Sequence, residues 1–138
     1  MEVCLTYLLC GCYYFFMIKR LLCILSMLIT LPAFCGEFEE AARTHNKIFL
    51  YLYTKDCGYC VKFDPVYKKI SQIYGANCKF LKINADSEYG TSLMRSLNAY
   101  YVPFVVVIDN DKRVAHSISP TCLLSYSCTQ DKMNKFVN

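Results

Sequence analysis

The sequence predicts an α/β domain with a mixed central sheet flanked by helices on both faces, preceded by an N-terminal signal peptide or membrane segment. Three observations lead to this prediction. Helix-type and strand-type patterns alternate along residues 37–138 in the order α-β-α-β-α-β-β-α. Two of the expected strands are unbroken apolar runs, which is typical of strands buried on both faces. Apolar residues make up 27 of the first 36 residues but only 49 of the remaining 102, so the two parts differ in kind.

Residues 1–35 have the composition of a signal peptide or a membrane anchor. A basic pair, Lys19-Arg20, precedes the apolar run 21–31, and a small-x-small sequence then allows cleavage before Gly36. Met17, just before the basic pair, is an alternative start of translation. The other interpretation is a retained anchor with the basic pair on the cytoplasmic side. Both interpretations predict an exported domain, periplasmic or extracytoplasmic and in the second case membrane-anchored, in a compartment where disulfides persist.

The domain of residues 36–138 begins with an expected helix and an expected buried strand. Residues 37–46 have acidic side chains in the first turn, which suits the positive end of a helix dipole. Residues 47–54 (KIFLYLYT) read as a strand buried on both faces. After a CxxC sequence, residues 60–74 have apolar side chains at helical spacing, with a kink expected at Pro65.

Five further elements are expected in the second half of the domain. They are a strand at 79–84, a helix at 87–97, a buried strand at 103–108, an antiparallel partner strand at 112–117 and a short helix at 130–137. The turn between the last two strands is Asp109-Asn110-Asp111, a sequence rich in turn-forming side chains.

The segment Cys57-Gly58-Tyr59-Cys60 is where we expect the chemistry. It lies between a strand and a helix, so Cys57 falls at the helix N-terminus, where free N–H groups and the dipole stabilise a thiolate. Cys60 falls in the first helical turn, and Gly58 is expected to allow the tight turn. This asymmetry suits dithiol exchange, because an exposed sulfur attacks a disulfide and a protected neighbour resolves the mixed disulfide. We therefore predict Cys57 and Cys60 as the catalytic pair.

Two other interpretations of this pair stay open at this stage: a structural disulfide, or half of a zinc site completed by Cys122 and Cys128. The five-residue gap between the latter two is long for a zinc knuckle, and we predict no metal. We predict instead a structural disulfide between Cys122 and Cys128, which requires a turn between them because a continuous helix would hold them too far apart. Two free thiols or a second redox pair are the alternatives. Cys78 is expected to be a buried small hydrophobe.

These residues make the domain resemble the thioredoxin superfamily. The resemblance covers residues 37–138 and rests on four features: the Cys57–Cys60 motif after its strand, Pro65 five residues beyond it, the segment Lys82-Ile83-Asn84 to Asp86, and Tyr101-Val102-Pro103 before an apolar strand.

The resemblance implies a thioredoxin fold and a substrate-binding site. It implies that Pro103 is a cis-proline packed beside the CxxC pair, and that the Val102 backbone pairs with an extended substrate. Tyr59, exposed inside the motif, is expected to contact substrate as well. The dipeptide Gly58-Tyr59 is similar to that of periplasmic disulfide isomerases and related exported proteins. Tyr51 stands where thioredoxins bury an aspartate, so proton transfer from Cys60 is expected to be less assisted.

The sequence therefore predicts an exported thiol–disulfide oxidoreductase that acts on protein thiols and disulfides, is recycled by a redox partner and needs no cofactor. The direction of electron flow stays open. One alternative is a non-catalytic thioredoxin-like adaptor in a membrane or secretion complex, and another is a membrane-tethered reductant for a single client. Nucleic-acid binding is disfavoured, because residues 37–138 hold 13 Lys and Arg against 10 Asp and Glu without a basic run.

Overall fold

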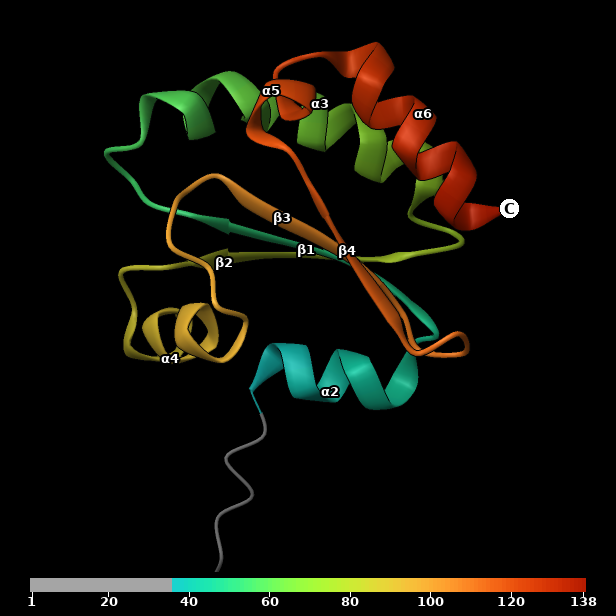
Figure 1. Cartoon of the computed structure of the whole chain (residues 1–138), viewed down its shortest axis with the longest axis horizontal. Coiled ribbons are helices and arrows are strands. Elements are labelled where there is room, and N and C mark those ends of the chain that lie inside the picture. The colour runs from blue at the N-terminus through green and yellow to red at the C-terminus, as the bar shows by residue number, and fades with distance from the viewer. Residues whose placement is uncertain (1–35) are drawn as a thin grey trace, which may run out of the picture. The chain divides into compact units, whose positions relative to one another are not determined.

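A four-stranded mixed sheet forms the centre of the computed structural model, which describes residues 36–138. Helices α3, α5 and α6 lie on one face of the sheet, and α2 and α4 lie on the other (Figure 1). The elements are α2 (Glu37–Thr44), β1 (Lys47–Tyr53), α3 (Gly58–Tyr74), β2 (Lys79–Asn84), α4 (Glu88–Ser96), β3 (Phe104–Asp109), β4 (Val114–Ile118), α5 (Pro120–Leu123) and α6 (Tyr126–Val137). The predicted α/β class, with a mixed sheet between helices, is confirmed.

The strand order is β2-β1-β3-β4. Strand β1 is parallel to β2, because α3 carries the chain back across the sheet between them, and it is antiparallel to β3. The hairpin turn keeps β3 and β4 antiparallel. The register places Tyr51 of β1 between Lys82 of β2 and Val105 of β3. A lysine of the sheet edge is thereby brought next to the strand that leads into the CxxC segment.

Strand β1 is buried on both faces, as its apolar run predicts. Phe49 and Tyr51 join the core under α3, α5 and α6, while Ile48, Leu50 and Leu52 join the core under α2 and α4. Each buried side chain of this size contributes about 1.5–3 kcal/mol to folding relative to exposure. Because both cores share β1, the segment that follows this strand begins from a fixed position.

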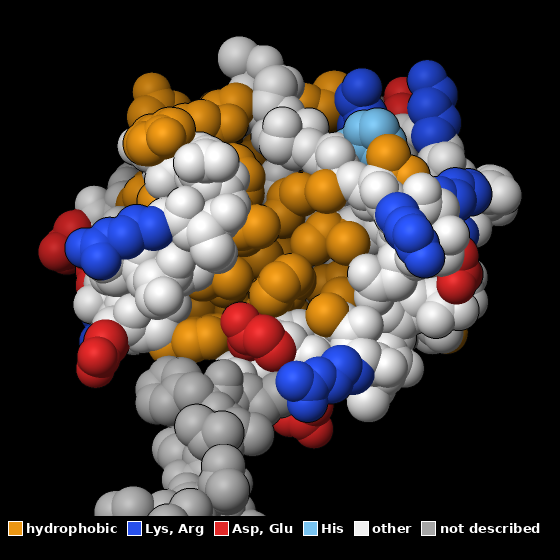
Figure 2. Space-filling view, turned by 60° about the horizontal axis from the view of Figure 1, so that its bottom comes forward, with side chains coloured by type: hydrophobic (Ala, Val, Ile, Leu, Met, Phe, Trp, Pro, Cys, Tyr) orange, Lys and Arg blue, Asp and Glu red, His pale blue; other side chains and the backbone are white. Residues whose placement is uncertain are grey.

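The face of the molecule that carries α2 and α4 is not fully covered by polar side chains. Figure 2 shows apolar side chains gathered in a hollow on this face, with Lys, Arg, Asp and Glu around its margin. Met94, Leu97 and Ile108 are only partly buried against the core beneath it. The larger apolar side chains of the sheet on this face, such as Ile48, Leu50 and Leu52, are buried, so its apolar surface comes from the partly buried side chains.

Most element boundaries differ from the predictions by one or two residues, and three of the differences are informative. Helix α3 begins at Gly58 and continues through Pro65 to Tyr74, although the proline has no N–H to donate to the carbonyl oxygen four residues earlier. Strand β4 begins at Val114, because Arg113 has a positive φ of 53° and belongs to the turn. Helix α6 begins at Tyr126, four residues earlier than predicted, and the one-turn helix α5 before it is not visible in the sequence pattern.

Residues 1–35, with the expected signal peptide or anchor and the alternative start at Met17, lie outside the described residues. Among the helices of residues 36–138, none combines the length and the apolar character needed to cross a bilayer.

Candidate active site

The CxxC segment opens helix α3, and its first cysteine caps that helix. Cys57 is the N-cap residue, with extended backbone, and its Sγ accepts a hydrogen bond from the N–H of Cys60 at 3.1 Å. The two cysteines are joined by a disulfide, with their Cα atoms 5.2 Å apart. A sulfur that accepts a helix N-terminal N–H in this way is stabilised as a thiolate once the disulfide is opened. The cap position that the sequence suggests for Cys57 is the position observed.

The two sulfur-bearing residues differ in exposure. Cys57 is partly exposed, whereas Cys60 is only 2% exposed and packs into the core under α3. Tyr59, between them, is 60% exposed. Gly58 has no positive φ, and a Cβ there would meet nothing within 4 Å, so the tight turn that Gly58 was expected to allow does not depend on a glycine. One accessible and one shielded sulfur is the arrangement that stepwise exchange requires.

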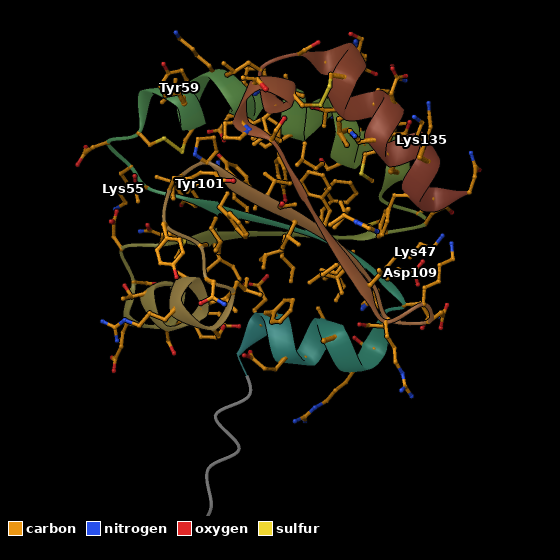
Figure 3. The ribbon with its side chains drawn as sticks, viewed as in Figure 1. Lys47, Lys55, Tyr59, Tyr101, Asp109 and Lys135 are labelled. Atoms are coloured by element: carbon orange, nitrogen blue, oxygen red, sulfur yellow. A yellow bond between two sulfur atoms is a disulfide. The ribbon has the colours of Figure 1, made fainter. Side chains whose placement is uncertain are left out.

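An apolar hollow of about 410 Å³ opens beside the motif. Its lining contains no charged side chain and is made of Tyr59, Tyr101, Val102, Pro103, Pro120, Thr121 and Leu124. The Val102–Pro103 peptide bond is cis. Figure 3 shows Tyr59 and Tyr101 at the same end of the molecule, away from Lys47, Asp109 and Lys135 at the other end. The structure therefore brings together the three residues expected to bind substrate.

Helix α5 supplies part of this hollow that the sequence reasoning missed. Pro120, Thr121 and Leu124 belong to this one-turn helix or follow it directly, and Leu124 is 43% exposed. A four-residue helix is too short to produce a recognisable hydrophobic period. The proline at its first turn, which suits a helix start, is the one local signal in the sequence.

A polar cluster lies on the buried side of the motif. The Tyr51 hydroxyl lies 3.2 Å from Asp64 Oδ1 and 3.3 Å from the carbonyl oxygen of Cys60, and it can donate to either. Lys82 Nζ donates to the same Asp64 oxygen at 2.7 Å. Burial above all, and then the Asp64 carboxylate, raise the pKa of Tyr51, so its hydroxyl stays protonated. The sequence has Tyr51 where thioredoxins bury an aspartate, so no carboxylate is expected from β1. In the structure, Asp64 of α3 supplies a carboxylate next to the Tyr51 hydroxyl.

The second cysteine pair joins α5 to α6. Cys122 and Cys128 form a disulfide with Cα atoms 5.3 Å apart, and the chain turns between them at Leu124 and Ser125. Cys122 is 5% exposed and Cys128 is partly exposed. Thr129 Oγ1 of α6 donates to the Cys122 carbonyl oxygen of α5 at 3.1 Å, so a hydrogen bond connects the two helices in addition to the disulfide. The bond therefore closes a short loop that also carries the α5 part of the hollow.

Two other features do not add to this site. Cys78 is free and 4% exposed, and burial raises the pKa of its thiol to about 12. It lines a larger, open hollow of about 780 Å³ that also includes Lys47, Lys79 and Val137. That hollow contains no cysteine pair, so its greater size does not make it the better candidate. Among residues 36–138, no three His, Cys, Asp or Glu side chains converge as metal ligands.

Residues 31–122 match the family model of thioredoxin. No curated protein matches the chain in sequence. Solved structures similar to this one include oxidised thioredoxin of Plasmodium falciparum (19% identity, 74% of this chain and 91% of that one, TM-score 0.61). Another is the Schistosoma mansoni thioredoxin pre-protein in its reduced form (22%, 74% and 91%, 0.62). A third is mitochondrial thioredoxin 3 of Saccharomyces cerevisiae (18%, 72% and 87%, 0.61). At these identities the structural matches establish the fold, which is the thioredoxin fold that the sequence resemblance implies.

Proposed function

The chain belongs to the thioredoxin family, and on this premise we propose that it is a thiol–disulfide oxidoreductase acting on proteins through Cys57 and Cys60. The observation that carries the proposal is the hydrogen bond from the Cys60 N–H to Cys57 Sγ at the start of α3. This donor stabilises the thiolate that attacks a disulfide or leaves from one. The dithiol is itself the redox group, so the reaction needs no cofactor.

In the reducing direction, the Cys57 thiolate attacks one sulfur of a substrate disulfide, and the other substrate sulfur leaves as a thiolate that takes a proton from water. A mixed disulfide then joins Cys57 to the substrate. Cys60 loses its proton and attacks Cys57 Sγ, which forms the Cys57–Cys60 bond and releases the second substrate thiolate. Two electrons pass from the protein dithiol to the substrate, and the reverse sequence oxidises a substrate dithiol. A redox partner returns the pair to its starting state.

Substrate binding is assigned to the hollow beside the motif. Val102, preceding the cis bond, offers backbone groups to an extended substrate segment, and Pro103 keeps that segment next to Cys57. Tyr59 and Leu124 line the same hollow and are exposed, so they offer apolar surface to this segment. The volume of about 410 Å³ suits one large apolar side chain next to the substrate cysteine.

The cellular location proposed for the enzyme follows from residues 1–35. We assign these residues to a signal peptide or a membrane anchor, so the domain works in an exported, oxidising setting. N-terminal sequencing of the protein recovered from cells tests this assignment. A mature N-terminus near Gly36 supports a cleaved signal, an intact head supports an anchor, and recovery from the cytosol with an intact head contradicts export.

Turbidity of insulin under dithiothreitol tests the enzymatic function. The proposed activity accelerates the precipitation of reduced insulin chains, and the Cys57→Ser variant returns the rate to background. A wild-type protein that also stays at background contradicts the proposal and favours a thioredoxin-like adaptor with a static Cys57–Cys60 bond.

A further inference from the structure

The two edge strands of the sheet differ in how they are protected. Within residues 36–138, β2 and β4 form the edges, so each has a row of backbone N–H and C=O groups that no other strand of this part of the chain pairs with. Edge strands commonly avoid pairing with foreign strands by carrying lysine, proline or a bulge. Strand β2 carries Lys79 and Lys82, whereas β4 (VAHSI) carries no Lys, Arg, Asp, Glu or Pro and pairs with β3 without a bulge. The outer edge of β4 is therefore open to an added strand.

A groove of about 340 Å³ is lined by residues of β3, β4 and helix α6. Its apolar lining includes the buried side chains Val107, Ile118 and Phe136. Because side chains alternate along a strand, Val114 and His116 lie on the same face of β4 as Ile118, which packs into the core under α6. A segment that pairs with β4 would therefore present every second side chain on the α6 side of the sheet.

The charge around this groove is positive and only partly compensated. The ionised side chains that line it are Asp109, Lys112, Lys132 and Lys135. Asp109 accepts a hydrogen bond from the Lys112 N–H at 3.1 Å and lies 3.7 Å from Lys112 Nζ, so these two charges largely cancel. Lys132 and Lys135 of α6 are exposed, and no carboxylate of the described residues forms an ion pair with either. Figure 3 shows Lys135 and Asp109 at the end of the molecule opposite Tyr59, so this charge lies away from the CxxC segment.

We propose that the outer edge of β4 and the neighbouring groove form a docking site for a partner protein, which adds an extended acidic segment to the sheet as a further strand. Backbone hydrogen bonds to β4 supply the pairing, and the side chains of the segment supply the specificity. Acidic residues at alternate positions of the segment all project to one side of the sheet, the side where Lys132 and Lys135 lie. Complementary charge also guides the approach of such a segment. The proposal is independent of the exchange reaction, because no cysteine lines this groove.

A second copy of this chain fits the same surface less well. Pairing of two β4 edges would bring the lysines of both copies to one place, and like charges disfavour that arrangement. An acidic segment of another protein supplies the negative charge that a second copy lacks at this edge. The segment can be short, because β4 itself runs only from Val114 to Ile118.

Fluorescence anisotropy with the full-length oxidised chain tests the proposal. The probe is a short fluorescein-labelled peptide that alternates threonine and glutamate. A second peptide has the same composition with all its glutamates at one end, and a third alternates threonine and lysine. Hydrogen exchange followed by mass spectrometry then reports whether the peptide protects the amides of residues 114–118, with β2, residues 79–84, as the reference edge.

The alternating acidic peptide is expected to bind more tightly than the other two and to slow hydrogen exchange in β4 but not in β2. Lys132→Gln and Lys135→Gln are each expected to raise its Kd by about two- to fivefold, the range for an exposed ion pair, and the double variant by about tenfold. Salt at about 1 M weakens the binding, because these charges are exposed. The matched control Lys68→Gln, an exposed lysine of α3 that does not line the groove, leaves the Kd unchanged.

Three results overturn the proposal. One is that the alternating acidic peptide does not bind. Another is that both acidic peptides bind equally and leave β4 unprotected, which shows that the lysines attract negative charge without strand pairing. The third is a dimer in sedimentation velocity whose β4 amides are already protected and that the peptide does not dissociate, because this edge then belongs to a second copy.

Discussion

The two disulfides of the described domain are similar in span and in burial. Their Cα atoms are 5.2 Å and 5.3 Å apart. Each joins a buried cysteine, Cys60 or Cys122, to a partly exposed one, Cys57 or Cys128. Each also lies at the start of a helix, α3 for the first pair and α6 for the second. Neither span nor exposure therefore explains why one pair should exchange and the other should not.

The difference lies in what caps each helix. In α3 the N–H of Cys60 donates to Cys57 Sγ at 3.1 Å. In α6 the N–H of Cys128 donates instead to Ser125 Oγ at 3.4 Å, and within residues 36–138 no N–H donates to a sulfur of the second pair. A thiolate at Cys57 thus accepts a hydrogen bond from an N–H in the first turn of α3. In α6 the corresponding N–H is donated to the Ser125 hydroxyl, so Cys128 has no such donor. On the function proposed above, we infer that the capping atom decides which cysteine pair reacts.

Replacing the cysteines should give the largest difference between the two pairs. Cys57→Ser is expected to lower disulfide exchange by at least about 1,000-fold, because it removes the attacking sulfur. Cys60→Ser is expected to leave a protein that accumulates mixed disulfides, visible on non-reducing gels and by mass spectrometry. The double variant Cys122→Ser with Cys128→Ser is the control and keeps its exchange activity. Trapping through Cys60 in the Cys57 variant would reverse the assigned roles.

The second pair should matter for stability. Replacing both Cys122 and Cys128 with alanine is expected to lower the free energy of unfolding by about 2 kcal/mol, the value for a loop of this length. Urea denaturation measures the loss, and exchange with a small disulfide should stay within about twofold of the wild type. Mass spectrometry of non-reduced peptides checks the bond. If both thiols are alkylatable in native exported protein, the second pair is not a structural disulfide.

Ser125→Ala tests the cap of α6 by itself. We expect a loss of about 1 kcal/mol in urea denaturation, because the first turn of α6 loses its side-chain acceptor. Ser87→Ala is the matched control, since Ser87 caps α4 in the same way through the Gly90 N–H at 2.9 Å and should cost a similar amount. An unchanged stability of the Ser125 variant alongside a destabilised Ser87 variant would show that Ser125 is not an effective cap.

The smallest effect should come from the hollow beside the first pair. Tyr59→Ala is expected to raise KM for a protein disulfide by about two- to fivefold, the range for a single peripheral contact, and to leave the rate with a small disulfide unchanged. Val61→Ala, an exposed apolar residue on the same helix that does not line the hollow, is the control. Equal effects of the two variants on KM would show that the hollow does not bind the substrate.

The sequence was sufficient for features carried by local patterns. The apolar run of β1 predicts its burial, and the change from strand to helix pattern places Cys57 at a helix start. Cys122 and Cys128 are separated by only five residues, so a turn between them is enough to bring the two side chains together.

Features that depend on contacts between elements could not be predicted in this way. Asp64 meets Lys82 across 18 residues, and only the packing of α3 on the sheet brings the two together. Helix α6 begins four residues before its predicted start, because Ser125 caps it and the pattern of apolar residues does not show that cap. Helix α5 is too short for periodicity to show it. Of the residues that line the hollow, the sequence therefore predicts Tyr59, Val102 and Pro103 as substrate-binding and misses those of the α5 segment.

The central claim is that the helix cap makes Cys57, and not Cys128, the reactive cysteine. Alkylation rates of the fully reduced protein as a function of pH, resolved for each cysteine by peptide mass spectrometry, test it most directly. We predict that the Cys57 thiolate forms below the ordinary thiol pKa of about 8.5, and that Cys128 gains no such advantage. Cys78 serves as an internal reference and stays unreacted, because burial raises its pKa to about 12. A Cys57 midpoint at or above about 8.5, or a Cys128 midpoint below that of Cys57, would contradict the account.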